Sequence, residues 1–493
     1  MRTFFTILVV SLPAAAHAQV PSYAHDVRAV FARAGCNQGT CHGNLTGKGG
    51  MKLSLRGENP DFDFLVFTRN LGSRRIDPAS PETSLLLLKA TGRVPHEGGV
   101  RFAPTSREYR IVRDWIAAGS PNDVGKKPAL ARLEVEPHEL WLPAPTRSAT
   151  VAVTAVFADG RRQAVNDSAV FESTNPRIDV THNGVVSSTG PGETTVVIRY
   201  LDGHATVPVT FIADRPDFVW TGPNPANYID DLVFAQLKKL RINASPVCTD
   251  ADFVRRVYLD VCGILPTPAE TRRFLADPAR DKRDRLIDAL VERPEFADWW
   301  ALKWADLLRV EEKMLDKKGV KLFQGWIRES IASGKPLNRM AHELVASRGS
   351  TYEHPAANYY RALREPNGRG EAFAQVFLGI RMKCAKCHNH PFDRWTQNDY
   401  HQLAAFFAQV VYKIGDNKRA DKLDSHEFNG DQTVALDPKL QVKHPVTGAV
   451  MTPHYLGDAA KVDAKADPLI TLADWVADPK NPFFARAQAN RIW

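Results

Sequence analysis

The stretch "EAFAQVFLGIRMKCAKCHNHPFDRWTQNDYHQLAAFFAQVVY", residues 371–412, determines how the C-terminal half of this 493-residue chain is interpreted. Apolar residues recur at helical spacing on both sides of a short polar segment. Thr396 and Asp399 occupy the positions of a capping box, which predicts that the second helix begins there. The stretch therefore predicts a helical domain that presents the Cys-His motif between two helices.

The motif itself is "CAKCH", residues 384–388. The thiols of Cys384 and Cys387 are spaced to form bonds to the two vinyl groups of one haem. The imidazole of His388 can then bind the iron, as in the Cys-x-x-Cys-His attachment signature. A zinc site, with His390 as a further ligand, is one alternative. A redox disulfide is another, although that motif normally follows a strand, and here a helix is predicted to precede it.

A second Cys-His motif lies near the N-terminus, in "AGCNQGTCHG", residues 34–43. Four residues separate Cys36 from Cys41, and His42 follows directly. Both thiols can still face one porphyrin if the chain loops outward between them, and Gly39 supplies backbone freedom for that loop. Haem attachment with His42 as the iron ligand is one interpretation, and zinc or a disulfide are the others.

The ligand on the opposite side of each iron is a further prediction. For the first motif we expect His96, in the loop "RVPHEGGVRF" before a predicted helix, with Met51 as the alternative. Two histidine ligands would give a lower reduction potential than histidine with methionine. For the second motif four candidates remain open, and an empty position would permit small-molecule chemistry. These candidates are His401, His444, Met451 and His454.

The pattern along the chain predicts a multidomain protein that combines helical and β-sheet domains. Residues 1–18 have the charge, apolar run and small residues of a secretory signal peptide. Residues 131–213 show short alternating strands separated by turns, as in a β-sandwich. The remaining predicted parts are a helical haem domain (20–122), a larger helical domain (225–412), a loop-rich segment (413–465) and the start of a further, truncated domain (466–493).

Composition and the remaining cysteines limit the functional classes. The formal charge is +8, but basic and acidic residues alternate, so nucleic-acid binding is not predicted. After the signal peptide no run approaches the ~20 apolar residues of a membrane span. Cys248 and Cys262 flank a predicted helix. Fourteen residues of helix would separate their Cα atoms by about 21 Å, too far for a disulfide.

Three blocks of sequence together resemble a known family architecture. "AGCNQGTCHG" with "EYRIVRDWIAAG" resembles the planctomycete-type cytochrome c domain. "VAVTAVFADGRRQAVNDSAVFESTNPRI" resembles a group 2 bacterial Ig-like domain. "FVRRVYLDVCGILPTPAE" with "VFLGIRMKCAKCHNHPFDRW" resembles the domain of unknown function that accompanies those cytochromes. The final segment, "LADWVADPKNPFFARAQANRIW", resembles the opening of the companion domain.

The resemblance implies an exported, haem-bearing protein of the periplasm or cell surface. Cys36, Cys41 and His42, and likewise Cys384, Cys387 and His388, occupy its haem-motif positions, so two haem c groups are expected. We expect electron transfer with a redox protein or a small-molecule donor or acceptor. The sequence leaves enzymatic activity undecided. The alternatives are a haem oxidase or peroxidase, a redox helper in polysaccharide breakdown with a surface polysaccharide as partner, and a non-redox binding protein with zinc at the Cys-His motifs.

Overall fold

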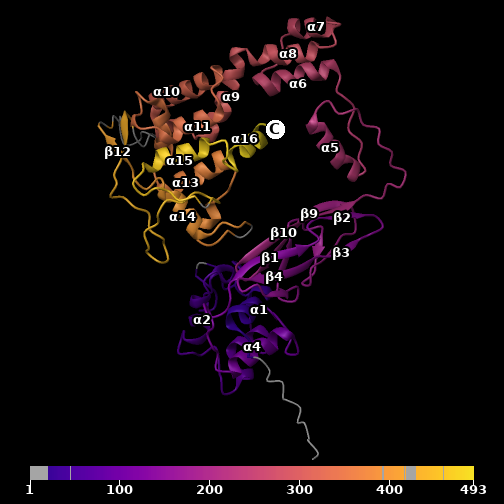
Figure 1. Ribbon diagram of the computed structural model, residues 1–493, viewed down its shortest axis with the longest axis vertical. Coiled ribbons are helices and arrows are strands. Elements are labelled where there is room, and N and C mark those ends of the chain that lie inside the picture. The colour runs from indigo at the N-terminus through magenta and orange to yellow at the C-terminus, as the bar shows by residue number, and fades with distance from the viewer. Residues whose placement is uncertain (1–19, 45, 391–392, 416, 418–428, 459) are drawn as a thin grey trace, which may run out of the picture. The chain divides into compact units, whose positions relative to one another are not determined.

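The computed structural model describes residues 20–493 except 45, 391–392, 416, 418–428 and 459 (Figure 1). The predicted signal peptide lies outside the described residues. The chain divides into two compact units, Met1–Asn243 and Ala244–Trp493. Helices and several small sheets both occur, which confirms the mixed α and β class.

Unit 1 begins with short helices around an aromatic core. Tyr23, Phe31, Phe67 and Trp115 are buried there, and the ring of Tyr23 stacks on Trp115 at 5.5 Å. The N-cap of the last helix is Ser106, whose Oγ accepts the Tyr109 N–H at 3.1 Å. The elements are η1 (Tyr23–Val27), α1 (Arg28–Arg33), η2 (Leu55–Gly57), α2 (Pro60–Thr68), η3 (Pro81–Thr83), α3 (Leu85–Ala90) and α4 (Arg107–Ala117).

Three small sheets follow in unit 1, with strand orders β1-β4-β5, β2-β10-β9-β6 and β3-β8-β7. Alternate residues of their strands, such as Val153, Ala155 and Phe157, are buried in one apolar core. Pairing is antiparallel except between β10 and β2. The strands are β1 (Leu130–Glu136), β2 (Leu140–Pro143), β3 (Ser148–Thr150), β4 (Ala152–Phe157), β5 (Arg162–Ala164), β6 (Val170–Ser173), β7 (Asp179–Val180), β8 (Val185–Ser187), β9 (Gly192–Tyr200) and β10 (Gly203–Ile212).

Polar contacts attach the N-terminal helices of unit 1 to its sheets. Nη1 of Arg33, at the end of α1, donates to three backbone carbonyls of the strand region, at 2.9–3.1 Å. Arg28 forms an ion pair with Asp202 at 2.7 Å. Nε2 of His25 donates to the Pro128 carbonyl at 3.1 Å. The helical part and the sheets are therefore one packed body.

Unit 2 is mainly helical and is built around a large core that includes Phe323, Phe373, Phe377 and Phe407. Its helices are α6 (Asp250–Cys262), α7 (Pro268–Ala276), α8 (Lys282–Val291), α9 (Pro294–Leu307), α10 (Glu312–Ala332), α11 (Leu337–Ala346), η4 (Pro355–Ala357), α12 (Asn358–Ala362), α13 (Pro366–Phe373), η5 (Ala374–Leu378), η6 (Lys383–Lys386), α14 (Gln397–Ala405), α15 (Pro468–Ala477) and α16 (Phe484–Ile492). Among the described residues, no helix is both long and apolar enough to cross a lipid bilayer.

Several local predictions are confirmed in unit 2. The sequence places Thr249 and Asp252 in capping positions and Gly263 at the end of the same predicted helix. Thr249 caps α6, and Gly263 ends it in the left-handed conformation, at φ 69°. Thr396 and Asp399 form the predicted capping box of α14. Cys248 and Cys262 are both free, and the Cys262 thiol donates to the Leu290 carbonyl.

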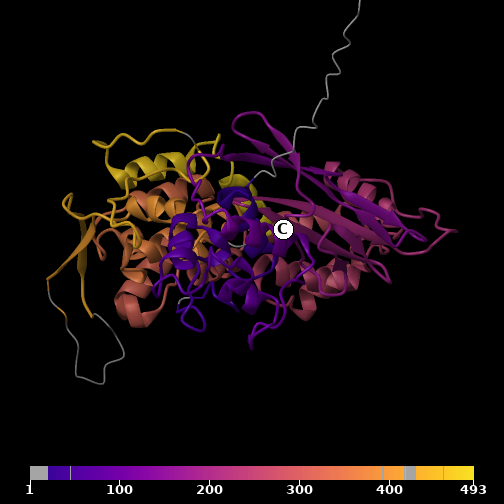
Figure 2. The same ribbon diagram turned by 90° about the horizontal axis from the view of Figure 1, so that it is seen from below.

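Four features were not part of the sequence-based expectation. Thr105 and Glu108 fit the sequence pattern of a capping box, but Ser106 caps α4 instead. The stretch 413–465 contains β13 (Gln432–Leu436), which pairs with β11 (Gly349–Ser350) and with β12 (Val410–Ile414). The helix α5 (Tyr228–Lys239) groups with unit 1 rather than with the helices that follow. Finally, α15 and α16 bury side chains in the core of unit 2, where the yellow α15 lies along α11 (Figures 1 and 2).

The half-buried His25 predicts that acid weakens unit 1. Burial, reinforced by the charge of Arg161, lowers the pKa of His25 below its ordinary value of 6.5. As the pH falls, His25 of the unfolded chain therefore takes up a proton at a higher pH than His25 of the folded chain. The free energy of unfolding then decreases as the pH falls below about 6.5. We expect His25→Gln, which keeps a donor for the Pro128 carbonyl, to reduce the loss between about pH 7.5 and pH 5.5.

The measurement is urea unfolding of the full chain, followed by oxidative labelling of Trp115, which is fully buried in unit 1. The exposed His138→Gln is the matched control and should keep the wild-type pH dependence. Equal pH dependence in wild type and His25→Gln would contradict the assignment.

Candidate functional site

Unit 1 contains a divided cavity that brings together the four predicted site residues of the first motif. One part, of about 130 Å³, is lined by Cys36, His42 and His96, and Met51 lies on its wall. The adjoining part, of about 490 Å³, is lined by Cys41 and by the same two histidines. Together they fall within the usual range of ligand sites, about 300–1,000 Å³. His42 and His96, which are 54 residues apart in the sequence, thus line the same cavity.

A turn after α1 brings the cysteines and His42 together. The Cys36 N–H donates to the Phe31 carbonyl at 3.0 Å, and Gly35, at φ 73°, ends α1 just before the first cysteine. The His42 N–H then donates back to the Cys36 carbonyl at 3.0 Å. The four residues between the cysteines therefore loop outward and return the chain, so the wider cysteine spacing still leaves His42 beside Cys36.

The imidazole rings of His42 and His96 both line this cavity and lie nearly parallel to each other. Their centroids are 6.2 Å apart, and their planes differ by only 8°. Metal–imidazole bonds are about 2.0–2.1 Å long, so two imidazoles bound to opposite sides of one metal ion have centroids roughly 6 Å apart. The observed centroid separation is close to that value.

Backbone carbonyls determine which nitrogen of each ring is free. Nδ1 of His42 lies 3.1 Å from the carbonyl oxygens of both Lys48 and Met51. Nδ1 of His96 lies 2.9 Å from the Gly99 carbonyl oxygen. A carbonyl can only accept, so Nδ1 carries the proton in both rings and Nε2 keeps its lone pair. This arrangement is typical of histidines that bind a metal through Nε2.

The electrostatics of the cavity favour neutral ligands and an acidic guest. Burial lowers the pKa of His42, which keeps its imidazole neutral. Burial raises the pKa of the Cys36 thiol to about 12. Arg75 and Arg101 line the cavity, and Nε of Arg101 donates to the Ala34 carbonyl at 2.7 Å. Sequence reasoning missed these two arginines, because no motif links them to the cysteines.

The second motif, in unit 2, has a different environment. Cys384 and Cys387 are exposed, at the short helix η6, and both are free. Nδ1 of His388 donates to the carbonyl of the next residue, Asn389, at 2.7 Å, so its Nε2 is also the nitrogen with a lone pair. His390 is engaged through its backbone, donating to the Trp395 carbonyl at 2.7 Å.

Two of the open ligand candidates lie near this motif. His401 is buried, and its Nε2 lies 3.3 Å from the Lys386 carbonyl oxygen, so Nε2 carries the proton. The ring of His444 lies 5.6 Å from that of His401. Nδ1 of His444 accepts the N–H groups of Val446 and Thr447. His401 thus supports the backbone of the motif. In the neutral ring of His444, the proton is on Nε2 because Nδ1 accepts.

The other two candidates have separate surroundings. Nδ1 of His454 donates to the Tyr455 carbonyl at 2.8 Å. Met451 forms a backbone hydrogen bond to the Val442 carbonyl at 2.9 Å. Among the described residues, no group of three or more His, Cys, Asp or Glu side chains could hold a metal ion directly.

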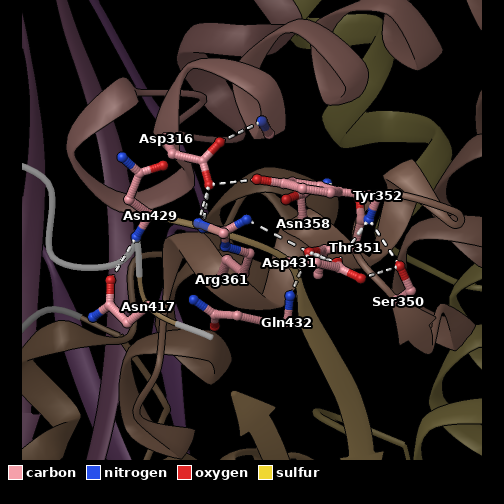
Figure 3. Close-up of polar contacts among 12 residues, drawn as sticks. Asp316, Ser350, Thr351, Tyr352, Asn358, Arg361, Asn417, Asn429, Asp431 and Gln432 are labelled. Carbon is pink, nitrogen blue, oxygen red and sulfur yellow. Dashed lines mark hydrogen bonds and ion pairs between the residues drawn. The ribbon is translucent and has the colours of Figure 1, made fainter. Parts of the chain in front are cut away.

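A buried polar network is the second notable feature of unit 2 (Figure 3). Asp316 interrupts α10 with a φ of 56° and is 2% exposed, while its partner Arg361 is fully buried. The carboxylate accepts the Gly319 and Gly430 N–H groups and the Tyr352 hydroxyl, at 2.8–2.9 Å. Nη2 of Arg361 lies 3.2 Å from it.

The network connects four segments that are distant in sequence. Asp431, beside Gly430, accepts hydrogen bonds from Ser350 Oγ at 2.6 Å and from Thr351 Oγ1 at 3.0 Å (Figure 3). Burial alone would raise the pKa of Asp316, but the donated hydrogen bonds and Arg361 outweigh it, and the pKa is lowered. The complete burial of the pair indicates a structural role.

Residues 228–412 match a protein family model described as PSCyt2, a protein of unknown function (DUF1549). The matched segment begins with α5 and contains Cys384, Cys387 and His388. Over this segment the chain is similar to that family, as expected for the domain of unknown function that accompanies the cytochromes. No curated protein matches the chain.

The buried pair in unit 2 predicts a large stability effect. Arg361→Met leaves the buried Asp316 carboxylate without its counter-charge, so we expect a loss of about 3–5 kcal/mol in the free energy of unfolding. Replacing both, as Asp316→Asn with Arg361→Met, should cost less than the sum of the single changes. The measurement is urea unfolding of the full chain with oxidative labelling of Trp304, buried in unit 2.

The matched control is Asp298→Asn, which removes an ion pair with Arg328 whose side chains are 57% and 42% exposed. It should cost at most about 1 kcal/mol. If Arg361→Met costs no more than this control, the buried pair does not stabilise unit 2.

Proposed function

We propose that this chain is an exported electron-transfer protein that carries covalently bound haem c. The first haem would lie in the cavity of unit 1, with thioether bonds to Cys36 and Cys41 and with His42 and His96 as the two iron ligands. The observation that carries the proposal is the pair of parallel imidazoles at 6.2 Å, each with its Nδ1 proton on a backbone carbonyl.

The residues of the cavity have distinct roles in this proposal. The carbonyls of Lys48, Met51 and Gly99 orient the two rings and keep Nε2 unprotonated. Arg75 and Arg101 supply positive charge for acidic propionate groups. A haem bound there would supply a one-electron iron couple, and two histidine ligands would keep its potential lower than histidine with methionine.

A second haem is proposed at Cys384 and Cys387, with His388 as the ligand. His401 donates to the Lys386 carbonyl and so supports the turn between the two cysteines. That role leaves Nε2 of His401 protonated. This observation argues against His401 Nε2 as the second ligand. If His444, Met451 and His454 do not bind either, the iron position is open, as the second candidate function, a haem oxidase or peroxidase, requires.

The proposed domains follow the family resemblance. They are a cytochrome c domain at 20–122, a group 2 bacterial Ig-like sandwich at 131–213 and the cytochrome-associated domain at 225–412. The proposed location is the periplasm or the cell surface, and the proposed partner is a redox protein or a small molecule.

Haem content provides the first test of this function. Full-length protein, matured with a cytochrome c assembly system, should show a Soret band, stain for haem on a denaturing gel and carry a mass increment of two haems. The paired change Cys384→Ala/Cys387→Ala should remove one haem, and Cys36→Ala/Cys41→Ala the other.

The control pair Cys248→Ala/Cys262→Ala removes the two cysteines outside the motifs and should leave both haems in place. A colourless protein with zinc at the motifs would refute the proposal and favour the non-redox alternative.

The ligand assignment is tested by His96→Ala in the background that lacks Cys384 and Cys387. Loss of the second imidazole should open one iron position, so the reduced protein should bind carbon monoxide while its parent does not. His96→Met should restore a six-coordinate iron at a higher potential.

Met51→Leu is the control, because Met51 contributes its backbone carbonyl rather than its side chain to the hydrogen bond with His42. If Met51→Leu opens the iron and His96→Ala does not, Met51 is the ligand instead.

A further inference from the structure

Unit 2 contains an open cavity of about 740 Å³ whose polar lining is dominated by arginine. It lies between the segment around η5 and the last helix, α16. Four guanidinium groups line it, and its apolar wall includes Leu307, Leu378 and Phe483. The four arginines are Arg381, Arg394, Arg486 and Arg491.

Among the residues that the structure describes, no acidic one lines this cavity. None of the four arginines forms an ion pair with an acidic residue in the described part of the chain, whereas Arg283 pairs with Asp250 elsewhere in unit 2. Asp458, which follows the lining residue Gly457, accepts the indole N–H of Trp475 at 3.1 Å instead. The positive charge of the cavity is therefore not neutralised from within its own lining.

Packing determines where two of these guanidinium groups lie. Arg491 donates to the carbonyls of Val376 and Gln375, at 2.6 and 3.0 Å. Arg394 lies over the Trp395 ring, at 4.6 Å. Gly457 has a φ of 67°, and a Cβ added there would lie 3.0 Å from Nη2 of Arg394. The absence of a side chain at position 457 thus lets Arg394 approach the cavity wall.

We infer that this cavity binds a small organic anion with two or more carboxylate, phosphate or sulfate groups. Guanidinium groups recognise such oxyanions through paired, charge-assisted hydrogen bonds. Several arginines around one cavity match several negative groups on one ligand. The wall formed by Leu307, Leu378 and Phe483 would contact the carbon skeleton between those groups.

The inference rests on the cavity alone and does not require haem. A haem attached at Cys384 and Cys387 carries two carboxylates of its own, and Arg381 lies three residues before Cys384. A free polyanion and the propionates of such a haem would both present carboxylates or similar groups to the arginines. The experiment therefore has to distinguish a free ligand from haem propionates.

The test is calorimetric titration of the full chain with citrate and with inorganic pyrophosphate, and acetate serves as the singly charged comparison. We expect one site for each polyanion and no measurable binding of acetate. Arg394→Ala/Arg486→Ala should weaken binding about tenfold or more, since each change removes a charge-assisted contact. Gly457→Ala should also weaken it, by displacing Arg394.

The matched control is Arg255→Ala/Arg256→Ala, which removes two exposed arginines of α6 away from the cavity lining and should leave the affinity unchanged. An equal loss in the control, or no polyanion binding by wild type, would overturn the inference. Binding only in Cys384→Ala/Cys387→Ala would overturn it as well, because the cavity would then serve haem propionates. The haem test above can fail without affecting this result.

Discussion

The arrangement of the first site depends on backbone carbonyls that accept the Nδ1 protons of two histidines. In water an imidazole exchanges its proton between two nitrogens. In the cavity of unit 1, the carbonyls of Lys48, Met51 and Gly99 keep it on Nδ1. Both lone pairs are then on Nε2, and the two rings are parallel. The turn that carries His42 and the loop that carries His96 thus place two imidazoles with the same free nitrogen at one cavity.

The two motifs show why a short pattern predicts chemistry better than it predicts environment. The spacing of Cys384, Cys387 and His388 is the regular one, yet both cysteines are exposed. The spacing of Cys36, Cys41 and His42 is irregular, yet its cysteines and histidine line a cavity with a second histidine. The local sequence determines which reactive side chains a motif contains. The surrounding loops determine whether those side chains are exposed or line a cavity with other residues.

The same distinction explains what the sequence could predict. Capping at Thr249 and Thr396 follows from contacts within one turn, so it was predictable. The pairing of β13 with β11 joins residues more than 80 positions apart, and the alternation of β13 is too short to be recognised in a polar segment. Asp316 and Arg361 likewise meet only after folding. Neither residue lies in a pattern that distinguishes a buried charge from an exposed one.

The contacts of Arg33 bear on the role of the sheets in unit 1. Arg33 ends α1, three residues before Cys36, and its guanidinium donates to the carbonyls of Asn166, Ala169 and His182. These carbonyls belong to the strand region, so the segment that leads into the first motif is attached directly to it. A flexible spacer would need few such contacts. The packed interface instead makes the sheets a support for α1, which limits movement of the segment leading to Cys36 relative to the strands.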